Sequence, residues 1–101
     1  MNLNLNYEGF DAYLIKRMEL TDYRQGVKYR FRFPNRFGAS VIKHKYSYGY
    51  DCDLWELAVL RYGADEDDWD LCYFTDITDD IIGHLTDKEV RELLQRIKDL
   101  E

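Results

Sequence analysis

Residues 27–33 constrain the fold most strongly, because apolar and cationic side chains alternate there without interruption. The two sets are apolar Tyr29, Phe31 and Phe33, and cationic Lys28, Arg30 and Arg32. A period of two is typical of a strand with one buried and one exposed face. The stretch from Pro34 to Gly38 then predicts a hairpin connection, because Gly38 can adopt a positive φ. We therefore expect a return strand over residues 39–46.

Two further strands are predicted downstream. Residues 54–61 are almost continuously apolar, which is typical of a central strand covered on both faces. Residues 63–68 read as a turn, and residues 69–75 as a fourth strand. Upstream, residues 10–19 are ambiguous between helix and strand. Their apolar spacing favours a short helix.

The C-terminal region predicts an amphipathic helix. Thr86 and Glu89 stand in the spacing of a capping box, in which each side chain accepts a hydrogen bond from the other residue's backbone N–H. One apolar stripe follows at helical spacing: Val90, Leu93, Leu94, Ile97 and Leu100. Residues 78–82 resemble the first turn of a further helix, capped by Thr78.

These elements predict a single α+β domain over residues 1–101. We expect an antiparallel meander of about four strands, covered by the C-terminal helix, with a possible short N-terminal helix. No apolar run approaches the roughly 18 residues that a membrane span needs. The first ten residues have neither the basic nor the long apolar segment of a secretory signal. We therefore expect a cytoplasmic protein that does not bind membranes.

The charge of the chain is distributed unevenly. The net charge is −6, yet residues 1–50 hold nine Lys and Arg against four Asp and Glu, and residues 51–101 hold five against sixteen. A net negative protein is a poor general binder of nucleic acid, since phosphate contacts need positive potential. The acidic half favours a basic protein partner. The simpler interpretation is that these acids only keep the protein soluble.

Two segments are candidate protein-binding sites. The first is an acidic stretch that contains Asp65, Glu66, Asp67, Asp68 and Asp70. The second is a glycine-bearing loop with Tyr46, Tyr48 and Tyr50. Tyrosine is enriched at binding hot spots, but two of these three rings could equally pack on the edge of the sheet.

The cations of the first half suggest an alternative site for nucleic acid. Lys28, Arg30 and Arg32 share one strand face, and Lys43 and Lys45 would join them if the return strand aligns accordingly. Aromatic side chains beside cations are what single-strand binders use. The competing interpretation is that this face is solvated or pairs with acids of residues 65–80.

No catalytic or metal-binding motif is recognisable. A calcium loop starting at Asp65 would need glycine and glutamate where Asp70 and Asp76 stand. His44, His84, Cys52 and Cys72 lack the short spacings of zinc sites. There is no phosphate loop, dinucleotide fingerprint or nucleophile elbow. We expect a protein that is not an enzyme and that holds no cofactor and no metal.

Several short strings resemble a group of small proteins encoded by phages and prophages. They are Phe33–Asn35, Gly38–Ile42, Ser47–Gly49, Leu54–Leu60 and Ile77–Asp80 leading to Gly83. In that group the residue before Phe37 is often glycine, whereas here it is Arg36. The group has no assigned activity, so the resemblance implies only a phage or mobile-element origin, and with it the cytoplasm of a bacterial host.

Together these observations favour an interaction protein that binds a host protein through the acidic stretch and the tyrosine loop. A defence or nucleic-acid-handling enzyme, inhibited by the binding, is the expected class of partner. A nucleic-acid-binding accessory protein that uses the cationic strand face is the alternative. A small enzyme with an unrecognised carboxylate site is a third reading, whose mark would be a carboxyl group of raised pKa in a pocket.

Overall fold

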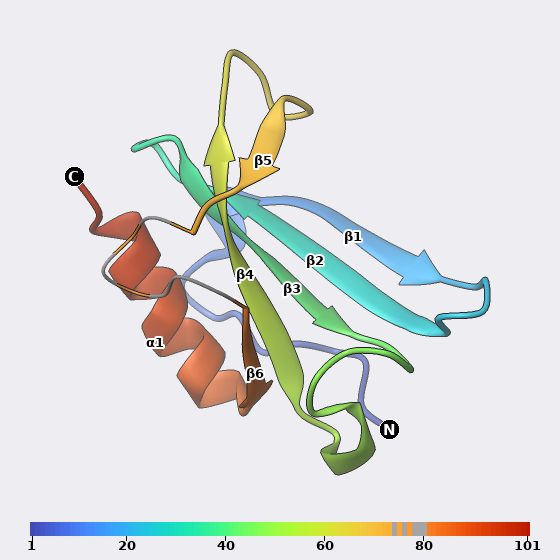
Figure 1. The fold of residues 1–101 in the computed structure, drawn as a ribbon. Coiled ribbons are helices and arrows are strands. Elements are labelled where there is room, and N and C mark those ends of the chain that lie inside the picture. Colours follow the sequence, from blue (N-terminus) through green and yellow to red (C-terminus); the bar gives the residue numbers. More distant parts are fainter. Residues whose placement is uncertain (74, 76, 78–80) are drawn as a thin grey trace.

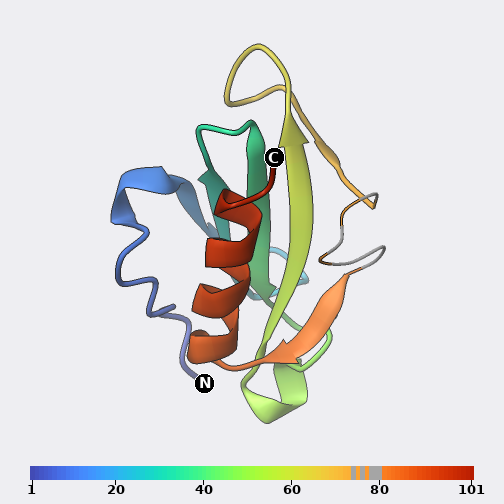
Figure 2. The same cartoon turned by 90° about the vertical axis from the view of Figure 1, so that its left-hand side faces the viewer.

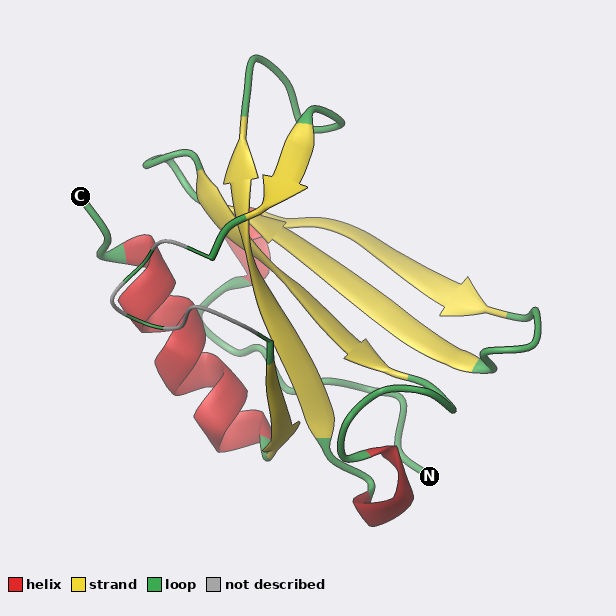
Figure 3. Cartoon of the chain, in the orientation of Figure 1, coloured by secondary structure: helices red, strands yellow, loops and turns green. Residues whose placement is uncertain are grey.

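One antiparallel sheet with a helix against one of its faces makes up the computed structural model (Figures 1 and 3). The structure describes residues 1–73, 75, 77 and 81–101. Its strands are β1 (Leu14–Leu20), β2 (Gly26–Arg32), β3 (Phe37–Lys43), β4 (Trp55–Tyr62), β5 (Trp69–Leu71) and β6 (Ile82–Leu85). Its helices are α1 (Asp87–Lys98) and two 3-10 turns, η1 (Asp11–Tyr13) and η2 (Tyr50–Cys52).

Strand β4 is the centre of the sheet. The strands follow the order β1-β2-β3-β4-β5, and β6 also pairs with β4. One edge of β4 pairs with β3, while the other edge pairs with β6 near Trp55 and with β5 near Tyr62. The predicted α+β class and antiparallel meander are therefore confirmed, with more strands than the four expected.

The alternation of β2 divides the sheet into two faces. Val27, Tyr29 and Phe31 are buried, while the cations between them are only partly covered. On the apolar face lies α1, whose Val90, Leu94 and Ile97 are fully buried (Figure 2). The capping box of Thr86 and Glu89 is present as predicted. Leu60 and Tyr62 are buried on the opposite face, which explains why β4 is so uniformly apolar.

A side chain from the β2–β3 turn holds the C-terminal end of α1. The amide nitrogen of Asn35 donates to the carbonyl oxygens of Ile97, Lys98 and Leu100, at 2.8, 3.0 and 3.0 Å. Its amide oxygen accepts from the backbone N–H of Phe37 at 2.9 Å. One residue therefore closes the turn and binds carbonyls in the last turn of α1 and just beyond it.

The next residue of this turn is conformationally unusual. Arg36 has a φ of 70°, in the left-handed region that glycine occupies without steric cost. The turn geometry thus suits glycine better than the arginine that this chain carries.

The helix expected within residues 10–19 is wrong. Only the single turn η1 is helical, and β1 follows it directly. Strand β1 is an edge strand whose side chains are mostly exposed, so it lacks the buried alternation that identifies a strand. Its register also shifts between Leu14 and Lys16. Pairing with β2, rather than local periodicity, determines the structure of this segment.

Three other predicted boundaries need correction. The return strand runs from Phe37 to Lys43 instead of over residues 39–46, and the fourth strand ends at Leu71. Ile82 begins strand β6, whereas a helical turn was expected there. The expected cap Thr78 and the adjacent Asp79 and Asp80 lie outside the described residues.

Truncating the centre of the helix stripe tests this architecture. We expect Leu94→Ala to lower the free energy of unfolding by about 2–5 kcal/mol, because it leaves a cavity between α1 and the sheet. The exposed neighbour Glu92→Ala should change it by less than about 0.5 kcal/mol. Urea denaturation measures both values. Equal values for the two variants would contradict the packing described here.

Candidate functional site

Three exposed tyrosines gather at one end of the sheet. Tyr23 lies in the β1–β2 turn and is 71% exposed, and Tyr46 and Tyr48 in the β3–β4 connection are 68% and 64% exposed. The ring centroids of Tyr23 and Tyr46 are 5.8 Å apart. A backbone hydrogen bond of 2.8 Å from Lys45 to Arg24 joins the two segments. We call Tyr23, Tyr46 and Tyr48 the tyrosine end.

The backbone beneath these rings is held in place. The backbone N–H of Tyr48 donates to Oε1 of the buried Glu56 at 2.9 Å, and its carbonyl accepts from His84 of β6 at 3.2 Å. Ser47 is buried, and its hydroxyl bonds both the N–H and the carbonyl of His44. The rings of Tyr46 and Tyr48 are thus carried on a backbone held by hydrogen bonds. In the turn that carries Tyr23, the backbone N–H groups of Arg24 and Gln25 donate to Asp22.

Glycine allows the loop to approach β6 closely. A Cβ on Gly83 would lie 2.4 Å from the Cβ of Tyr48, and Gly49 has a φ of 101°. Beside this contact is an open hollow of about 310 Å³. It is lined by Lys45, Ser47, Tyr48, Gly49, Tyr50, Asp51, Cys52 and His84. This end of the sheet therefore has both protruding rings and a recess.

Of the three tyrosines expected from the sequence, the structure exposes two. Tyr46 and Tyr48 project from the loop, while Tyr50 begins η2 and is half-buried. Tyr23 was not predicted. The sequence signal that could have identified Tyr23 is an aromatic residue in an otherwise polar turn, where it belongs to no strand face and no helix face.

The acidic residues lie at the other end of β4. The β4–β5 turn carries Asp65, Glu66, Asp67 and Asp68, all exposed, and Asp70 is exposed on β5. We call residues 65–68 the acidic turn. Figures 1 and 2 both show this turn and the β3–β4 connection at opposite ends of β4. The two predicted protein-binding segments therefore do not form one continuous patch.

Part of the acidic turn is engaged in its own structure. Oδ1 of Asp65 accepts from the backbone N–H of Asp67 at 2.9 Å, and Oδ2 of Asp68 accepts from that of Ala64 at 3.2 Å. The carboxylate of Asp67, 86% exposed, lies 3.5 Å from the guanidinium of Arg30. The suggestion that the cationic strand pairs with downstream acids thus holds for this one pair.

The structure places three of the five predicted cations on this strand face. Lys28, Arg30 and Arg32 share the face opposite α1, and Lys16 of β1 joins them across from Arg30. We call these four the cationic face. Lys43 is not part of it, because its register position opposite Val27 puts it on the apolar face. Lys45 follows the end of β3 and lines the hollow of the tyrosine end.

Lys43 instead forms a charged cluster at the edge of the core. It is 2% exposed, and its Nζ donates to Oδ1 of Asp53 at 2.9 Å and to the Asn2 carbonyl at 2.7 Å. The same Nζ lies 4.1 Å from the centre of the Trp55 ring. The indole N–H of Trp55 donates to Asp87 of α1 at 2.6 Å. These contacts connect β3, β4, the N-terminal segment and the start of α1. The role of Lys43 is therefore structural.

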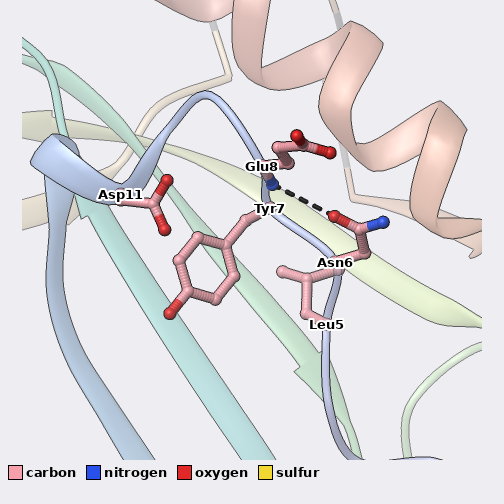
Figure 4. Close-up of a pocket in the computed structure, with 5 residues that line it drawn as sticks. All are labelled: Leu5, Asn6, Tyr7, Glu8 and Asp11. Carbon is pink, nitrogen blue, oxygen red and sulfur yellow. Dashed lines mark hydrogen bonds between the residues drawn. The ribbon is translucent and has the colours of Figure 1, made fainter.

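An additional hollow lies along the N-terminal segment (Figure 4). It measures about 360 Å³ and is lined by Leu5, Asn6, Tyr7, Glu8 and Asp11. The Tyr7 ring packs on Tyr29 and Phe31, and the side chain of Asn6 accepts from the backbone of Glu8. The carboxylates of Glu8 and Asp11 are exposed, so no acid at this place is held in an apolar pocket.

The described residues contain no candidate metal site, because no group of three or more of their His, Cys, Asp and Glu side chains is placed to hold a metal ion. Cys52 and Cys72 are free thiols. His44 accepts from the backbone N–H of Tyr46 through Nδ1, and burial lowers the pKa of its imidazole. None of the helices formed by the described residues has the length and apolar character needed to span a membrane.

The Lys43 cluster generates a pH-dependent prediction. The ammonium of Lys43 lowers the pKa of the Asp53 carboxyl, so this contact stabilises the fold above the carboxyl's usual pKa of about 4 and is lost as the pH falls below it. Asp53→Asn should therefore be less stable than the native protein at pH 7, and its stability should fall less steeply from pH 5 to pH 3. Asp51→Asn, which makes the same charge change without a bond to Lys43, should keep the native slope. Urea midpoints measured across this range test the prediction.

Comparison with known proteins gives no assignment. The chain matches no protein-family model, and neither a curated protein nor a solved structure is significantly similar to it. The resemblance to phage-encoded proteins therefore stays a prediction, and the function has to be argued from the surfaces described above.

Proposed function

We propose that the protein is a non-enzymatic interaction protein that binds another protein through its tyrosine end. The observation that carries this proposal is the exposure of Tyr23, Tyr46 and Tyr48 on a backbone held by hydrogen bonds. Exposed tyrosines supply a large contact area at a small cost in side-chain entropy. Aromatic anchors of this kind dominate the binding energy of many interfaces.

The partner that we propose is a protein of a bacterial host. The resemblance to phage-encoded proteins supports this origin, and the excess of acid in the second half of the chain favours a partner with a basic surface. Enzymes that handle nucleic acid, including defence enzymes, have such surfaces. Binding of the acidic turn to one of them would inhibit it by competing with its substrate.

The distance between the two contact regions shapes this proposal. Strand β4 has eight residues, so its ends are about 26 Å apart at roughly 3.3 Å per residue. A partner that touches both the tyrosine end and the acidic turn must therefore extend along β4. We propose the tyrosine end as the principal contact and the acidic turn as a separate, charge-dependent one.

The tyrosine end is tested by removing its rings. The triple variant Tyr23→Ser, Tyr46→Ser and Tyr48→Ser should fold as the native protein does, because all three rings are exposed. We expect it to lose at least about 30-fold in affinity for a partner isolated from host lysate, as loss of a hot spot of about 2 kcal/mol implies. Tyr73→Ser, at an exposed tyrosine outside the tyrosine end, is the matched control. Equal dissociation constants for the triple variant and the native protein would refute the proposal.

The acidic turn is tested separately. Asp65→Asn, Asp67→Asn and Asp68→Asn combined preserve the side-chain oxygens that accept hydrogen bonds in the turn. We expect weaker binding of the same partner and a smaller dependence of affinity on salt, since charge contacts are screened by ions. An unchanged affinity and salt slope would remove the acidic turn from the interface and leave the tyrosine end as its site.

A further inference from the structure

The face of the sheet opposite α1 holds a concentration of positive charge that the proposed protein contact does not use. The pairing of β1 with β2 sets Lys16 directly across from Arg30 and Met18 across from Lys28. These four residues line a shallow hollow of only about 20 Å³ that opens to solvent, so a ligand would lie over it rather than inside it. Of the described residues, three cations and no carboxylate line it. We call it the cation hollow.

These cations repel one another. Like charges at directly paired positions of neighbouring strands destabilise a sheet. Burial lowers the pKa of the Lys28 ammonium, and the charges of Arg30, Arg24 and Lys16 lower it further. Within the described residues, the only ion pair formed by Lys16, Lys28 or Arg30 is the one between Arg30 and Asp67. The cation hollow thus has a surplus of positive charge that an anion would relieve.

The side chains of the hollow are held before any ligand arrives. The Trp69 ring centre lies 4.9 Å from Nζ of Lys28 and 5.6 Å from Cζ of Arg30. Contacts of cations with an aromatic face reduce the freedom of both side chains. The Nε of Arg30 is buried and faces the hydroxyl of Tyr62, so it is not the group that meets a ligand. The terminal nitrogen of Arg30, which contacts the exposed carboxylate of Asp67, is the donor that an anion would reach.

We infer that the cation hollow binds a compact phosphate-bearing anion, such as an oligophosphate or the phosphates of a nucleotide, contacted by Lys16, Lys28 and Arg30. Clustered Lys and Arg donors suit the several oxygens and multiple charges of such a group. The acids at the rim favour a compact ligand over a nucleic-acid chain. Among the described acids, Asp67 is exposed beside Arg30 and would repel a phosphate backbone that continued past the hollow.

The acidic turn acts as an internal competitor for this site. Asp67 occupies the guanidinium of Arg30 at 3.5 Å while remaining 86% exposed, which is the geometry of a weak and easily exchanged pair. An arriving phosphate would replace this carboxylate on Arg30. Removing the charge of Asp67 should therefore strengthen phosphate binding.

The experiment is calorimetric titration of the whole protein with inorganic tripolyphosphate at low ionic strength. We expect Lys16→Gln and Lys28→Gln each to weaken binding about tenfold, as loss of one charge-assisted hydrogen bond implies. Lys88→Gln makes the same charge change on α1, across the sheet, and should have little effect. Asp67→Asn should strengthen binding about two- to fivefold. Asp65→Asn, the same change in the same turn without contact to Arg30, should strengthen it less.

Three outcomes would overturn the inference. One is that tripolyphosphate does not bind. The second is that Lys88→Gln weakens binding as much as Lys16→Gln, which would show a general charge effect instead of a site. In the third, a single-stranded oligothymidylate binds through Lys16 and Lys28 while tripolyphosphate does not, which would make the ligand a nucleic-acid backbone. Lys16→Gln and Lys28→Gln alter neither the tyrosine end nor the acidic turn, so their results are independent of the proposed protein contact.

Discussion

The alternation of side chains along β2 is the constraint on which the rest of the structure depends. Burying Val27, Tyr29 and Phe31 on the apolar face of the sheet, where Tyr7 of the N-terminal segment packs on two of them, forces Lys28, Arg30 and Arg32 onto the opposite face. One strand therefore supplies both apolar surface for the core and the positive surface that remains without an equivalent number of acids. A shift of β2 by one residue would exchange the two and destroy both.

Most of the fold could be predicted where local pattern and tertiary environment agree. The β2 alternation, the apolar run of β4 and the capped stripe of α1 each reflect burial on one or both faces, and each is where it was expected. Strand β1 could not be predicted in the same way, because an edge strand with exposed side chains has no buried period to read. Strand β6 has only four residues and depends on pairing with β4, a contact that its own residues do not encode.

The candidate sites were predictable as segments but not as surfaces. The tyrosine loop and the acidic turn were recognisable from composition, whereas their separation along β4 depends on strand direction and length. Lys43 shows the same limit. The face on which Lys43 lies depends on the strand register. The register puts it on the apolar face, where its Nζ contacts Asp53 and Trp55. Tyr23 joins Tyr46 only through the contact of two turns that are distant in sequence.

The bonds from Asn35 to the end of α1 have a consequence for the order of folding. Turns of a helix usually form and fray locally, on their own timescale. Here the carbonyls of Ile97 and Lys98 are bound by a residue 62 and 63 positions earlier in the chain. The final turn of the helix therefore gains these hydrogen bonds only when the β2–β3 hairpin is docked against it. Fraying of the helix end is thus coupled to opening of that hairpin.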